Sequence, residues 1–106
     1  MSMTEPHTTS DGSLVFTGRL DALEAPAMRA RFQERIAAGA SDLVADLSSC
    51  TFIDSAALAA LVSALKAARE RGGELVLVSP RSADTRRVFE LTHFDKVFTM
   101  LAPTAP

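Results

Sequence analysis

The chain has 106 residues, 47% hydrophobic and 23% charged, and its 11 Lys and Arg against 13 Asp and Glu leave a formal charge of −2. This is the size and composition of one small globular domain, and the balanced charge argues against a dedicated nucleic-acid binder or a polybasic membrane-surface protein. One cysteine cannot form an internal disulfide, and no apolar run approaches the roughly 18 to 20 residues of a membrane span, so we expect a soluble cytoplasmic protein without a signal peptide.

The first 50 residues predict an arm, a strand, a helix and a second strand. Residues 1–12 are polar and aperiodic, which is typical of a flexible arm or at most a weak edge strand. Residues 13–17 are β-rich, and Gly18 with Asp21 is expected to close that strand into a loop. An amphipathic helix is predicted over 24–38, and 42–47 lacks alternation, as in a strand buried on both faces.

The second half predicts a loop, the longest helix, a strand, a third helix, a final strand and a tail. Asp54 is a suitable N-cap for the longest helix, and we expect Leu91 on the buried stripe of the third helix, with Phe52 as a core residue. In chain order these six segments are 48–54, 55–71, 74–78, 82–92, 97–100 and 102–106.

The alternation of strands and helices predicts an α/β fold with right-handed crossovers. We expect a single small domain over 13–101, with a mixed, mostly parallel β-sheet of about four to five strands and three to four helices. Functional groups of such sheets gather in loops at the carboxyl ends of parallel strands. The segments 18–21 and 46–55 are therefore the candidate functional loops.

Ser55 follows Asp54 at the start of the predicted long helix, where four backbone N–H groups lack intrahelical partners and the helix dipole adds partial positive charge. A phosphate would suit this position, and it adds about 1.5 to 2 negative charges and three acceptor oxygens. A partner packed closely over the small Ala56 and Ala57 would meet that bulk and charge, and an acidic group opposite would be repelled. The stretch therefore predicts an on/off switch.

A purely structural interpretation stays open, in which Asp54 is only a helix cap and Ser55 only a favourable first-turn residue. An enzyme built on Asp21, Asp46 and Ser55 is disfavoured, because no general base of suitable type or spacing is visible. Cys50 and the two histidines make a poor metal set, so we expect neither a metal nor a cofactor.

Several short segments stand in a specific order and spacing along residues 13–100. They are Gly18-Arg19-Leu20-Asp21, then Asp46-Leu47-Ser48 followed by Phe52-Ile53-Asp54-Ser55-Ala56-Ala57-Leu58, and lastly Gly72-Gly73-Glu74-Leu75-Val76-Leu77 with Val88-Phe89-Glu90-Leu91. In this order they resemble the STAS domain family and, within it, the anti-sigma factor antagonists.

The resemblance implies a switched binding protein with no catalytic machinery of its own. In that family an anti-sigma factor serine kinase phosphorylates the serine that matches Ser55. The unphosphorylated antagonist binds the kinase and frees the sigma factor, the phosphorylated form lets go, and a metal-dependent phosphatase resets it. Asp21 and Asp54 are then expected to shape kinase docking, beside Ala56 and Ala57.

Two residues depart from the family pattern. Ala57 stands where the family usually has glycine two residues after the acceptor serine, which is expected to stiffen the first helical turn and puts close backbone approach of a partner there in doubt. His93 stands where glycine is favoured before the last strand, and histidine is among the residues that enter left-handed geometry. The same resemblance also admits a non-phosphorylated STAS subunit of a lipid-transport ATPase complex.

Overall fold

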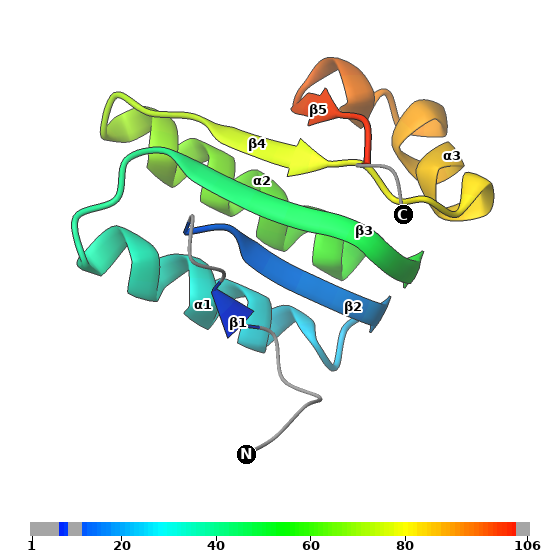
Figure 1. Cartoon of the computed structure of the whole chain (residues 1–106), viewed down its shortest axis with the longest axis horizontal. Coiled ribbons are helices and arrows are strands. Elements are labelled where there is room, and N and C mark those ends of the chain that lie inside the picture. The colour runs from blue at the N-terminus through cyan, green and yellow to red at the C-terminus, as the bar shows by residue number, and fades with distance from the viewer. Residues whose placement is uncertain (1–6, 9–11, 104–106) are drawn as a thin grey trace.

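A five-stranded sheet in the order β1-β2-β3-β4-β5 organises the computed structural model, which describes residues 7–8 and 12–103 (Figure 1). The first pair, β1 and β2, is antiparallel, and each later neighbour in the sheet is parallel. The elements in chain order are β1 (His7–Thr8), β2 (Leu14–Leu20), α1 (Ala25–Ala37), β3 (Leu43–Ile53), α2 (Ser55–Glu70), β4 (Leu75–Val78), α3 (Ala83–Leu91), the 3₁₀ turn η1 (Phe94–Lys96) and β5 (Thr99–Leu101). The predicted α/β class with a mixed, mostly parallel sheet is confirmed.

Helices α1 and α2 cover one face of the sheet, and α3 lies at the end toward which β3 and β4 point (Figure 1). Strand β3 buries alternate residues, Leu43, Ala45 and Leu47, against this helical layer. Helix α2 meets them with a buried stripe of small and medium side chains, because alanine lets a helix approach a sheet closely. The stripe comprises Ala57, Leu58, Ala60, Leu61, Ala64, Leu65 and Ala68.

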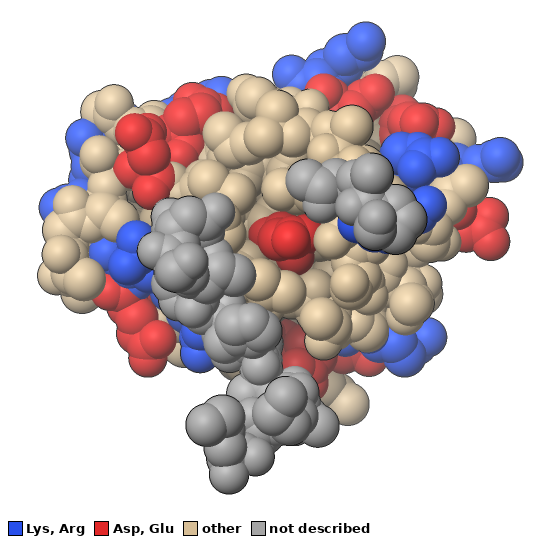
Figure 2. Space-filling model, in the orientation of Figure 1, with Lys and Arg blue, Asp and Glu red and all other residues tan. Residues whose placement is uncertain are grey.

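The other face of the sheet is left partly open to solvent. Val44 and Asp46 of β3 and Val76 and Val78 of β4 are half-buried, and they alternate with the core residues of the same strands. Seen from this side, uncharged side chains dominate the centre and most charged ones gather toward the rim (Figure 2). The core therefore lies between the sheet and the α1–α2 layer.

The expected loop over 48–54 is wrong, because β3 continues to Ile53. Its second half pairs with the second half of β2 as Thr17 with Ser49 and Leu20 with Ile53, with shifts in register along the way. Because the pairing is irregular and Ser49 is exposed, this half of β3 lacks the regular alternation of buried and exposed residues by which a strand is recognised in a sequence. Gly18 lies inside β2 at one of these shifts, with φ of +74°, and does not close the strand as expected.

Two expected core residues are exposed instead. Leu91, at the end of α3, is 72% exposed, and Phe52, near the end of β3, is 36% exposed. The turn at His93 has the expected left-handed geometry, with φ of +62°. The last strand is Thr99–Leu101, slightly later than the predicted 97–100. Most of the predicted arm 1–12, and residues 104–106 of the predicted tail 102–106, lie outside the described residues.

Candidate functional site

The ends of β2 and β3 bring the two predicted functional loops together. Leu20 pairs with Ile53, and the backbone N–H of Asp54 donates to the Leu20 carbonyl at 3.1 Å. Because the two strands are parallel, the residues that follow them, Asp21 and Asp54, emerge at the same edge of the sheet. Ser55 then begins α2 at this edge, so the sequence-predicted residues share one site.

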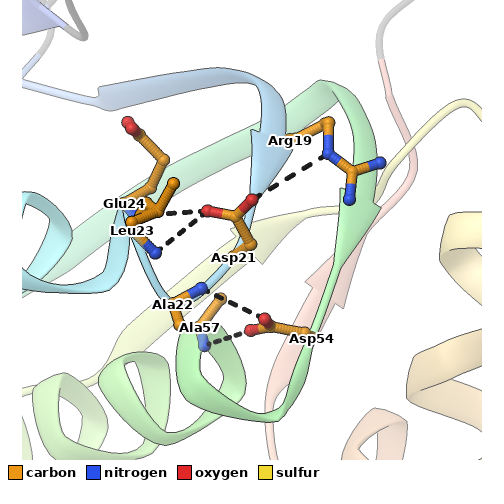
Figure 3. A network of polar contacts seen from close by, with 7 residues as sticks. All are labelled: Arg19, Asp21, Ala22, Leu23, Glu24, Asp54 and Ala57. Carbon is orange, nitrogen blue, oxygen red and sulfur yellow. Dashed lines mark hydrogen bonds and ion pairs between the residues drawn. The ribbon is translucent and has the colours of Figure 1, made fainter.

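The Asp54 carboxylate is occupied by hydrogen bonds from within the domain. Its Oδ1 accepts from the backbone N–H groups of Ala56 (3.0 Å) and Ala57 (3.1 Å), which caps α2. Its Oδ2 accepts from the backbone N–H of Ala22 at 3.1 Å (Figure 3). Asp54 is thus the predicted N-cap and also joins α2 to the turn that leads into α1.

The Asp21 carboxylate also closes its own turn. Oδ1 accepts from the backbone N–H groups of Leu23 (3.1 Å) and Glu24 (3.3 Å), while the Asp21 carbonyl accepts from Glu24 and Ala25. Oδ2 lies 3.9 Å from Nε of Arg19, a long ion pair on the open side of the turn (Figure 3). Residues 21–24 therefore form a turn whose backbone is held by Asp21 and by Asp54.

Arg19 and Phe52 stack on each other beside this turn. They are neighbours in the β2–β3 pairing, and the guanidinium carbon lies 4.1 Å from the centre of the Phe52 ring. The contact is a cation–π interaction between two exposed side chains. It explains how Phe52 can remain outside the core.

Ser55 is exposed at the first position of α2, so its hydroxyl is accessible from outside the domain. It stands at one end of an open, largely apolar groove between α2 and the segment after α3. The groove is lined by Ser55, Leu58, Ala59, Val62, Ser63, Thr92 and Phe94. A partner that docks on this face would cover the serine.

The small residues after Ser55 do not all face outward. Ala57 has no exposed surface and packs into the core, whereas Ala56 is half-buried and Ala59 is exposed. Ala57 was expected to offer a partner-binding surface, but its methyl group points into the domain and has none to offer. The outer surface beside Ser55 is therefore set by Ala56 and Ala59, and the departure from glycine at Ala57 adds no bulk there.

The remaining chemically notable groups are built into the structure. The Asp46 carboxylate accepts from the backbone N–H of Ser48 at 2.9 Å within β3, whereas the Asp21 carboxylate is held in the turn after β2. Burial, with a smaller contribution from Asp46, raises the pKa of the Cys50 thiol to about 12, and that thiol contacts the Phe16 carbonyl. Within residues 7–8 and 12–103, no group of three His, Cys, Asp or Glu side chains is arranged to hold a metal ion.

Leu23 and the Arg19–Phe52 pair are the site features that the sequence did not indicate. Leu23 is 86% exposed on the turn held by Asp21 and Asp54. In the sequence, Leu23 lies between the predicted loop at 18–21 and the predicted helix over 24–38, which indicates only a connecting segment. The pairing of Arg19 with Phe52 depends on the shifted β2–β3 register, which the residue pattern does not reveal.

Comparisons with known proteins identify a family and several solved structures that resemble this chain. A family profile described as "Mlab, STAS domain" matches residues 3–102. An anti-sigma factor antagonist from Mycobacterium paratuberculosis is 29% identical, with a TM-score of 0.70, 97% of this chain covered and 90% of that one. A Thermotoga maritima protein assigned as an anti-sigma factor antagonist is 27% identical, with a TM-score of 0.78 and coverage of 96% and 87%.

A more distant solved structure shares the fold. The Bacillus cell fate determinant SpoIIAA, in its phosphorylated form, is 20% identical, with a TM-score of 0.69 over 94% of this chain and 90% of that one. In the part of this chain that the structure describes, no helix is long and apolar enough to cross a membrane.

Proposed function

Since this chain belongs to the STAS domain family, we propose that it is an anti-sigma factor antagonist switched by phosphorylation of Ser55. Unphosphorylated, it binds an anti-sigma factor serine kinase and frees the sigma factor in the cytoplasm; a phosphatase that acts on phosphoserine resets it. The observation that carries the proposal is the exposed Ser55 hydroxyl at the capped start of α2. Its support is the likeness to two antagonists at 27% and 29% identity.

The local hydrogen bonds indicate how the phosphate would act. Asp54 already accepts from Ala56 and Ala57, so a phosphate on Ser55 would not gain these two N–H groups unless it displaced the cap. It would instead stand beside the Asp54 carboxylate and project toward the partner. The added charge of about 1.5 to 2 would roughly double the formal charge of −2. The switch then works by repelling the partner, while the domain keeps its fold.

The domain supplies the acceptor and the kinase supplies the chemistry. The Ser55 oxygen would attack the terminal phosphorus of ATP, ADP would leave, and the hydroxyl proton would pass to a base. Both carboxylate oxygens of the adjacent Asp54 already accept hydrogen bonds. We therefore assign the base to the kinase and no catalytic group to this chain.

Mass spectrometry after incubation with ATP and a purified serine kinase from the source organism tests the switch. Wild type should gain one phosphoryl group, Ser55→Ala none, and Ser63→Ala one. Ser63 is the matched control because it is exposed on the same helix, with its hydroxyl bonded to Arg29. In a pull-down, Ser55→Ala should retain the kinase and Ser55→Asp should lose it. Modification at another residue, or equal recovery of both variants, would contradict the proposal.

A second candidate is a non-phosphorylated subunit of a lipid-transport ATPase complex. The observation in its favour is the family description, which names Mlab. The apolar groove that starts at Ser55 would then pack permanently on the ATPase. Co-purification with a membrane ATPase that is unchanged in both Ser55→Ala and Ser55→Asp would favour this function, since a permanent contact requires no modification.

A further inference from the structure

The two carboxylates at the site are engaged in contacts within the domain, which leaves the recognition of a partner to other side chains. Both Asp54 oxygens and one Asp21 oxygen accept backbone hydrogen bonds, and the remaining Asp21 oxygen faces Arg19 at 3.9 Å. We infer that Asp21 and Asp54 are positioning residues. Asp21 and Asp54 then influence the binding of a partner by fixing the backbone of the turn between β2 and α1.

This turn presents Leu23 to solvent. Leu23 is 86% exposed, the largest exposed fraction among the large hydrophobic residues in the described part of the chain. Its own N–H is held by Asp21, and the N–H of the preceding Ala22 is held by Asp54. A single exposed leucine is ordinary on a protein surface, but this one is fixed on a turn tied to the same cap that precedes Ser55. Little backbone entropy remains to be lost when a partner covers it.

We propose that Leu23 is the apolar anchor with which the domain engages the kinase that phosphorylates Ser55. The kinase would offer an apolar pocket for Leu23, bordered by an acidic group that faces the exposed Arg19 guanidinium. A few fully desolvated residues near the centre of an interface carry most of its binding energy. This inference rests on the proposed function and adds the residue that would determine which kinase is bound.

Affinity measurements on Leu23→Ser test the anchor, with Leu101→Ser as the matched control. Leu101 is a half-exposed leucine on β5, which is separated from β2 by β3 and β4, roughly 14 Å at ordinary strand spacing. The probe is the purified kinase that phosphorylates wild-type protein. We expect Leu23→Ser to weaken the Kd at least about tenfold and to raise the KM for phosphorylation with kcat unchanged. Leu101→Ser should match wild type in both.

The outcomes separate the two proposals. If no serine kinase of the source organism binds or phosphorylates wild type, the proposed function fails and the anchor fails with it. If wild type is bound and modified at Ser55 but Leu23→Ser keeps its Kd within twofold, the anchor alone is overturned. Equal weakening of the Leu23 and Leu101 variants overturns it as well. Thermal melting of each variant establishes that it is folded.

Discussion

Replacing Asp54 by alanine tests whether this carboxylate holds the site together. The change removes the acceptor for two N–H groups at the start of α2, and loss of such a cap costs typically about 1 kcal/mol. It also removes the bond to the N–H of Ala22. That N–H lies in an exposed bond and can be hydrated, so we add at most about 1 kcal/mol. The free energy of unfolding should therefore fall by about 1–2 kcal/mol.

Urea and thermal denaturation measure this loss. For a domain of this size, a loss of about 1–2 kcal/mol corresponds to a Tm lower by about 4–16 °C. The matched control is Asp54→Asn, which keeps one acceptor for the helix cap and loses the negative charge; it should cost about 1 kcal/mol or less. Hydrogen exchange should quicken at Ala22 and Ala56 in the alanine variant. If the free energy of unfolding of Asp54→Ala lies within about 0.5 kcal/mol of the wild-type value, which is about the precision of the urea extrapolation, the positioning role assigned to Asp54 is refuted.

Two further predictions concern the turn after α2 and the buried thiol of Cys50. Gly73→Ala should lower the free energy of unfolding by about 3 kcal/mol or more, or prevent folding, because the added methyl group would overlap the backbone carbonyl of Ser41. Gly72→Ala should lower it by only about 1 kcal/mol, because the new methyl group would meet open space and the cost comes from the φ of +82° alone. Urea denaturation of the two variants compares these losses. Because the pKa of Cys50 is raised to about 12, the folded state holds its proton between about pH 9 and 12 where the unfolded state does not. Stability should thus fall as pH rises through that window, more steeply than in Cys50→Ala by up to about 1.4 kcal/mol per pH unit. Equal slopes in urea titrations at these pH values would contradict the assigned burial of the thiol.

Local patterns in the sequence predict much of the architecture, because helix periodicity, caps and glycine stops act over a few residues. Asp54 was expected to cap the long helix and does so through the two N–H groups that follow Ser55. The left-handed turn at His93 follows from the conformational preferences of one residue. The family resemblance, which is carried by short segments in a specific order and spacing, indicated Ser55.

Features that depend on contacts between distant segments could not be predicted from the sequence. The continuation of β3 through Ser49 to Ile53 depends on its irregular pairing with β2, because neither half of the pair has a distinctive pattern. That pairing places Arg19 on Phe52 and brings Ala22 within reach of Asp54, 32 residues away. Packing of α2 on the sheet buries Ala57, which was expected to face a partner, and the turn between β2 and α1 leaves Leu23 exposed. Residue type and spacing indicated the small, near-neutral domain and its candidate serine, whereas strand register decided which side chains surround that serine, because register is set by contacts summed along whole strands.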